Sequence, residues 1–179
     1  MKVIKKIGLV LLAIIAIALI LALFIKKDYM VSREVVINKP KQDVFNYIKF
    51  LKNQDKYSKW ATMDADMIKT YSGTDGTVGF VSAWDSKKDS VGKGEQTIKK
   101  ITEGESVDYL LHFIKPYNDV ADATMATTAI APNQTKVAWA IKGKMPYPMN
   151  LMQLFMNMDK MIGGDLAIGL ANLKLILEK

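Results

Sequence analysis

The chain of 179 residues contains no cysteine and only one histidine, His112. Without a thiol it can form no disulfide, and it offers neither a thiolate nucleophile nor a thiolate metal ligand. One histidine is too few for the usual zinc and non-haem iron sites. On the strand expected at residues 107–114, His112 alternates with Tyr109, Leu111 and Phe113, so its side chain is expected to face solvent. We therefore expect no metal and no cofactor, and the sequence identifies no catalytic residue.

The common motifs for phosphate binding, calcium binding and serine catalysis are missing as well. The glycine-rich segment at residues 92–94 lacks the spacing of a phosphate-binding loop and the helix that follows one. The loop at residues 85–90 carries lysine at its third position, and Gln96 stands at the twelfth, where a calcium loop has glutamate. No G-x-S-x-G segment occurs. The remaining ionisable candidates for acid–base chemistry, which no motif groups into a set, are Asp64, Asp66, Glu95 and Tyr109.

The excess of positive charge is small once the N-terminus is set aside. The whole chain has 25 basic and 18 acidic side chains, a net charge of +7. Five of the basic residues lie among the first 27 residues, and the first acidic residue is Asp28. The rest of the chain therefore has a net charge of +2, with its lysines scattered singly or in pairs. This mixed surface is typical of a solvated domain, and we expect no nucleic-acid partner.

The N-terminus carries the one long apolar segment of the chain. Residues 7–25 are 19 consecutive apolar residues without charge or proline. As a helix they span roughly 28 Å, close to the thickness of the hydrocarbon core of a bilayer. Lysines stand on both sides, and their long side chains can reach the lipid headgroups. The pattern predicts a transmembrane anchor at residues 1–27 that includes the basic flanks.

Two alternatives to an anchor are a cleaved signal peptide and a buried core helix. A signal peptide has a shorter apolar stretch and a small-residue cleavage site, whereas this run ends in Leu23, Phe24 and Ile25. A core helix is rarely apolar on every side. Positive charge is slightly greater before the run than after it, which favours a cytoplasmic N-terminus. We expect a single-pass membrane protein with an extracytoplasmic domain, in the inner membrane if the cell is bacterial.

Residues 28–179 are the right size for one domain. A β-branched run at residues 29–37 predicts a strand, and Asn38 can cap the helix predicted from the apolar spacing at residues 44–51. Trp60 is placed in a loop. Turn residues then separate runs of alternating polarity, which predict about six antiparallel strands, at residues 68–72, 77–84, 93–101, 107–114, 121–130 and 135–143.

The period becomes helical again after Pro146 and Pro148. An apolar stripe marked by Leu166, Leu170 and Leu173 predicts a long helix from about residue 149 to residue 177. This helix is the element long enough to fill the concave side of a curved sheet. The expected fold class is α+β, a curved antiparallel sheet wrapped around a long C-terminal helix and preceded by one transmembrane helix.

Several segments of this domain are similar to those of a known superfamily. They are VVINKPKQDVFNYI at residues 35–48, YSKWATMD at 57–64, VGKGEQTIKKI at 91–101 and GLANLKLILE at 169–178. With the order of elements, they resemble the helix-grip fold of the START-like superfamily, also called SRPBCC or polyketide cyclase/dehydrase-like, here as a membrane-anchored member. The resemblance covers residues 29–179 and implies a cavity between sheet and last helix, usually for an apolar ligand. It implies no single function, because the superfamily contains carriers, receptors, enzymes and chaperone co-activators.

Aromatic and methionine side chains are expected to line that cavity. Several lie on the faces assigned to the interior, and methionines crowd the start of the last helix, where flexible side chains suit an adaptable binding surface. The same residues can simply pack a core, and thioethers can also bind copper(I), which we consider the weaker interpretation. The candidate cavity residues are Trp60, Phe80, Trp84, Tyr109, Phe113, Met125, Trp139, Met152, Phe155 and Met156.

The leading hypothesis is a membrane-anchored domain that binds a lipid or another hydrophobic small molecule. One alternative is a cyclase or dehydratase-type enzyme on an apolar substrate, which requires a buried ionisable group with a shifted pKa in the cavity. Another is a regulatory or interaction protein that uses the groove, which requires a large exposed apolar patch outside the cavity.

Overall fold

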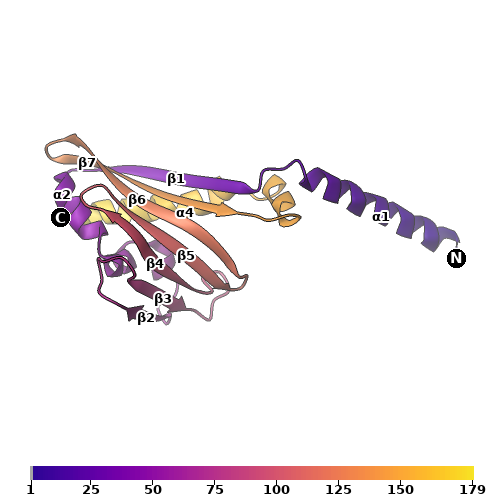
Figure 1. Cartoon of the computed structure of the whole chain (residues 1–179), viewed down its shortest axis with the longest axis horizontal. Coiled ribbons are helices and arrows are strands. Elements are labelled where there is room, and N and C mark those ends of the chain that lie inside the picture. The colour runs from indigo at the N-terminus through magenta and orange to yellow at the C-terminus, as the bar shows by residue number, and fades with distance from the viewer. Residues whose placement is uncertain (1) are drawn as a thin grey trace.

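The computed structural model describes residues 2–179. One seven-stranded antiparallel sheet dominates these residues, with the order β1-β7-β6-β5-β4-β3-β2 (Figure 1). Its strands are β1 (Asp28–Ile37), β2 (Ile68–Ser72), β3 (Val81–Asp85), β4 (Lys93–Thr102), β5 (Ser106–Lys115), β6 (Asp119–Ala131) and β7 (Gln134–Lys144). The helices are α1 (Lys2–Ala22), α2 (Lys41–Ile48), α3 (Lys59–Thr62) and α4 (Met158–Leu177), with 3₁₀ turns η1 (Leu51–Lys56) and η2 (Met149–Leu154).

The expected fold class is confirmed. After β1 and α2, six strands follow as a meander, and the last of them, β7, pairs with β1. The alternation of the sequence produces one buried face, because buried residues occur at every second position through the middle of β4 to β7. The helix α4 packs on the inner face of β1 and β7 (Figure 1). The chain is therefore a helix-grip domain with an apolar N-terminal helix.

Four sequence predictions about local structure are wrong. The long helix begins at Met158 and not near residue 149, because Asn157 caps it: its side chain accepts a hydrogen bond of 2.9 Å from the backbone N–H of Lys160. Asn38 does not cap α2, which begins after Pro40 without a side-chain cap. Trp60 lies in the short helix α3 and not in a loop. Residues 77–80 also form a turn before β3 rather than its first half.

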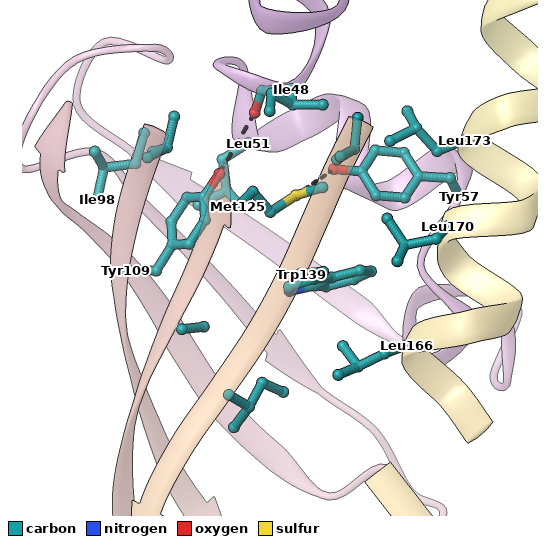
Figure 2. Close-up of a cluster of buried hydrophobic side chains, with 14 of the residues drawn as sticks. Ile48, Leu51, Tyr57, Ile98, Tyr109, Met125, Trp139, Leu166, Leu170 and Leu173 are labelled. Carbon is teal, nitrogen blue, oxygen red and sulfur yellow. Dashed lines mark hydrogen bonds between the residues drawn. The ribbon is translucent and has the colours of Figure 1, made fainter. Parts of the chain in front are cut away.

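The half of the domain next to α2 is filled by a packed core (Figure 2). Tyr57 and Tyr109 are fully buried there, and each hydroxyl has a partner: Tyr57 Oη donates to the sulfur of Met125 at 3.2 Å, and Tyr109 Oη to the carbonyl of Ile48 at 3.4 Å. The other large buried side chains include Phe45, Ile98, Leu166, Leu170 and Leu173. Large apolar side chains around these two bonded hydroxyls are typical of a packed core.

The apolar helix α1 is joined to the domain by η2. The side-chain amide of Asn150 donates to the carbonyls of Ala22 at 2.6 Å and Ile25 at 3.0 Å, and that of Gln153 to the carbonyl of Lys26 at 3.0 Å. These carbonyls belong to the end of α1 and the residues after it, which a helix leaves without intrahelical partners. The side chains of η2 therefore cap α1, and both Asn150 and Ala22 are fully buried.

We expect the Asn150→Ala variant to loosen this junction. It leaves two carbonyls without donors, at a cost of about 1–3 kcal/mol if they stay buried. Trypsin should then cleave after Lys26 or Lys27 several times faster than in the unmodified chain, measured on the full chain in lipid nanodiscs. Asn133→Ala, in the exposed turn between β6 and β7, is the matched control. Equal cleavage rates in both variants would contradict the assigned capping role.

Candidate ligand cavity

A cavity of about 270 Å³ lies between the sheet, α3 and the first turns of α4, and it is partly open to the outside. Its walls are mostly apolar and aromatic. The lining residues are Tyr29, Gln54, Asp55, Ser58, Trp60, Ala61, Met67, Lys69, Ser82, Ala83, Trp84, Val91, Gln96, Leu111, Phe113, Ala123, Trp139, Ile141 and Ile162. An apolar hollow with a few polar groups is the usual form of a small-molecule site.

Strand register places the cavity in one half of the sheet. Tyr29, near the start of β1, pairs with Gly143, near the end of β7, and Gly143 also pairs with Ala121 at the start of β6. The cavity residues Ala123, Phe113 and Ile141 lie within a few positions of the same ends. This is the end at which α1 joins the domain. The cavity therefore lies on the α1 side, and the packed core of Figure 2 lies on the other.

Three aromatic side chains that line the cavity each pack directly against a glycine. A Cβ added to Gly94 would lie 2.6 Å from Trp84, its cross-strand partner, and one added to Gly169 would lie 2.8 Å from Trp139. Tyr29 likewise covers Gly143. Because no side chain separates ring from backbone, the rings lie close against the strands and against α4. The glycines therefore set the position of the walls and leave the space in front of the rings open.

The segment VGKGEQ owes its two glycines to this arrangement. Gly92 has a φ of +66°, a conformation that favours glycine, and a Cβ there would collide with the carbonyl of Lys115. Gly94 makes room for the indole of Trp84, whose N–H donates to the carbonyl of Val91 at 3.3 Å. Gln96, two positions further, is buried and faces the cavity. This pattern in the sequence therefore marks one wall of the site.

Two buried N–H donors at the cavity have no protein partner among the described residues. They are the side-chain amide nitrogen of Gln54 and the indole nitrogen of Trp139. Figure 2 shows the indole nitrogen on the side of the ring toward Met125, away from Leu170 on α4. A buried donor without an acceptor costs free energy, and the indole nitrogen faces the packed core rather than the open space of the cavity. The buried side chains of Gln96 and Ser58 add further polar groups to the same walls.

The charged groups at the cavity form one cluster at its edge. The carboxylate of Asp55 accepts a hydrogen bond from Lys69 Nζ at 2.8 Å and another from the hydroxyl of Tyr71. Desolvation, followed by the hydrogen bond to Asp55, raises the pKa of Tyr71 to about 12. Asp55 and Lys69 therefore neutralise each other, and neither presents an isolated charge to the cavity.

The raised pKa of Tyr71 predicts a loss of stability in alkali. In the unfolded chain this phenol titrates near 10, whereas in the folded chain its pKa is about 12. The unfolded state then loses its proton first, so the contribution of Tyr71 is complete below pH 10 and falls as pH rises from 10 to 12. We expect the free energy of unfolding to decline less steeply over this range in Tyr71→Phe, measured by denaturant titration at each pH. A decline as steep as in the unmodified chain would contradict the assignment.

The structure distributes the ten candidate residues over three places. Trp60, Trp84, Phe113 and Trp139 line the cavity, where Trp60 meets Trp139 edge-on at 6.0 Å and Trp84 meets Phe113 edge-on at 6.3 Å between ring centroids. Three others belong to the packed core, with no place in the cavity walls, namely Phe80, Tyr109 and Met125.

The last three candidates lie outside the cavity, next to α1. Met152 lies in η2, and Phe155 and Met156 connect η2 to α4. They were expected on the inner face of a helix that begins near residue 149. Since the chain instead forms a separate 3₁₀ turn against the end of α1, Met152 and Phe155 are exposed and Met156 is half-buried.

Sequence reasoning missed the polar lining altogether. Gln54, Ser58 and Asp55 come from a segment that looked like a polar linker after α2, and the contacts of η1 and α3 bring it to the cavity. No periodic signal marks such short 3₁₀ segments. The inward position of Gln96 could have been predicted from the sequence, because Gln96 stands two positions after Gly94 on the inner face of β4.

Comparison of the sequence with protein-family models and with curated proteins finds no match in either. Solved structures similar to this chain share its fold at low identity. Truncated norcoclaurine synthase from Thalictrum flavum is 8% identical with a TM-score of 0.63, over 86% of this chain and 96% of that one. The Aha1 dimer from Colwellia psychrerythraea is 14% identical with a TM-score of 0.55, over 84% of this chain and 96% of that one. A protein from Chromobacterium violaceum is 12% identical with a TM-score of 0.58, over 84% of this chain and 97% of that one. These likenesses show a shared fold and leave the ligand open.

Proposed function

We propose that this chain is a membrane-anchored domain that binds a lipid or another hydrophobic small molecule in the cavity between its sheet and α4. The observation that carries the proposal is the composition of the cavity. Four aromatic candidates predicted from the sequence stand in its walls, beside the polar side chains of Gln54, Ser58 and Gln96. Apolar walls with few convergent polar groups suit an apolar body that carries an acceptor oxygen.

The size of the cavity restricts the ligand. Its volume of about 270 Å³ is slightly below the range typical of small-molecule sites. It suits one compact apolar molecule, or the end of one acyl chain, better than a whole two-chain lipid. The partly open wall then allows the rest of a longer molecule to extend outside.

Retention of α1 as an anchor is supported by its length and its contacts. The span Val3–Phe24 has a mean hydropathy of 3.3 and is almost wholly exposed, as a lipid-facing helix would be. A signal sequence passes the same test of composition. However, its removal would leave the amide of Asn150 without the carbonyls of Ala22 and Ile25. We therefore favour a helix that stays attached, with residues 28–179 as the ligand domain, extracytoplasmic by the charge rule.

A cyclase or dehydratase-type enzyme receives less support. The fold carries enzymes, as the name of the norcoclaurine synthase indicates. Yet the ionisable groups Asp55 and Lys69 in the cavity walls are paired with each other. Burial, followed by the charge of Asp119, raises the pKa of Tyr29, which keeps this phenol neutral. The groups left to face a ligand are amides, hydroxyls and an indole, which bind better than they transfer protons.

Native mass spectrometry of the full chain tests ligand binding directly. The protein is released from lipid nanodiscs at increasing collision energy, and any molecule that stays bound is identified by its fragments. We expect a stoichiometric apolar molecule that contains at least one acceptor oxygen. A chain that retains nothing, from nanodiscs of several compositions including native lipid extract, would overturn the proposal.

A further inference from the structure

We propose that residues 146–156, here called the η2 platform, lie in the membrane interface beside α1 and seat the cavity end of the domain on the bilayer. The inference rests on the proposed membrane anchor and goes beyond it, because an anchor alone leaves the domain free to stand away from the lipid. The partner of this surface is the headgroup and upper acyl region of the membrane.

The first observation is an exposed apolar surface without charge. No charged residue occurs between Lys144 and Asp159. Within this stretch Phe155 is 87% exposed, Leu154 59% and Met149 52%. Single exposed apolar residues are common on soluble proteins, but several in one uncharged segment mark an interaction surface.

The second observation is continuity with the end of the membrane span. Asn150 and Gln153 of the η2 platform bond to backbone carbonyls between Ala22 and Lys27. The backbone N–H of Met145 also donates to the carbonyl of Lys27 at 2.7 Å. Figure 1 shows η2 between the end of α1 and the sheet. When α1 spans the hydrocarbon core, its last turn reaches the headgroups, and these bonds hold the η2 platform at the same depth.

The third observation is the kind of residue at this depth. The η2 platform includes Tyr147, 41% exposed, and Phe155, and lysines 26 and 27 stand beside it. Aromatic rings and lysines are enriched where the hydrocarbon meets the headgroups. Lys26, Lys27 and Lys160 form no ion pair among the described residues, so their charges are available to lipid phosphates.

A bilayer fits this surface better than a soluble protein partner. The exposed side chains belong to a segment bonded to the end of the proposed membrane helix, so a protein would have to displace lipid to cover them. A membrane covers them without any further partner, and an interfacial segment needs only an apolar side at this depth. Residues on the α1 side of the domain, including the cavity, then come close to the lipid.

The absence of cysteine allows a direct test. Single cysteines are introduced by Phe155→Cys and Leu154→Cys, each is spin-labelled, and the full chain is placed in lipid nanodiscs. Collision with oxygen, which concentrates in lipid, is compared with collision with a water-soluble nickel complex. Ile130→Cys is the matched control, because it is apolar and 54% exposed but lies near the turn between β6 and β7, far from α1 (Figure 1). Leu12→Cys reports on the span itself.

We expect labels at positions 155 and 154 to collide several times more with oxygen than the label at position 130, and less than the label at position 12. One result would overturn the proposed membrane contact of the η2 platform and leave the anchor intact. In that result the labels at 155 and 154 are as accessible to nickel as the label at 130, while the label at position 12 is in lipid. A label at position 12 that is itself in water would overturn both. The two failures are therefore distinguishable.

Discussion

The Ala123→Phe variant is expected to fold and to lose its ligand. Ala123 is buried on the inner face of β6 and lines the cavity, opposite Ile141 and Tyr109 in the neighbouring strands. A phenylalanine there would place its ring in the empty space instead of in packed atoms. The usual cost of an oversized core residue, about 1–3 kcal/mol, should therefore be largely avoided. Stability should change little, while the volume that a ligand needs is taken.

Native mass spectrometry of the full chain from nanodiscs measures this effect. We expect the fraction of protein that retains a ligand to fall by about tenfold or more, which corresponds to at least ~1.4 kcal/mol of binding. Ala126→Phe is the matched control, with the same substitution in the same strand on the outer face. Lipid bound to α1 should persist in both variants. If Ala123→Phe retains as much of the same molecule as Ala126→Phe does, the ligand does not occupy this cavity.

Much of the fold could be predicted because the strands β4 to β7 alternate between buried and exposed positions over most of their length. The sequence around Tyr109 and around Trp139 places apolar residues at every second position, and both strands bury those positions. The apolar stripe through Leu166 and Leu173 likewise identified the helix that fills the sheet. Periodicity determines which face is inside, and a sheet with one apolar face needs a covering element.

The same periodicity could not show which inward-facing side chains line the cavity and which pack in the core. Tyr109 and Phe113 share one face of β5, yet Tyr109 is packed in the core and Phe113 lines the cavity. The difference arises from where α2 and α4 lie above the sheet, which is a matter of tertiary packing. Glycines carry part of this information, since Gly94 and Gly169 determine how close Trp84 and Trp139 lie to the backbone.

The methionine-rich segment shows how one local misassignment changes a functional interpretation. A helix that began near residue 149 would place Met152 and Phe155 in the cavity. The cap at Asn157 ends that continuity, and η2 packs against the end of α1 instead. An exposed apolar patch outside the cavity was the feature expected of an interaction protein. Its position beside α1 favours the membrane as what covers it.

The tight contact between Gly169 of α4 and Trp139 of β7 predicts a large loss of stability. In Gly169→Leu, the first added carbon would already lie 2.8 Å from Trp139 and 3.5 Å from the carbonyl of Tyr57. Either α4 must move away from β7, or the indole must turn into the cavity. Both responses disturb buried packing, and we expect the free energy of unfolding to fall by about 3 kcal/mol, the upper part of the usual range for overpacking.

Gly164→Leu is a matched control in the same helix. Gly164 is exposed, and a Cβ there would meet nothing within 4 Å. Replacing glycine at an open helix position should stabilise the chain by about 0.5–1 kcal/mol through helix propensity alone. Thermal unfolding of the full chain, with all variants in the same detergent, measures both effects. We expect Tm to fall by roughly 6–12 °C in Gly169→Leu and to rise slightly in Gly164→Leu. Similar shifts in both variants would mean that contact with Trp139 does not hold α4 in place.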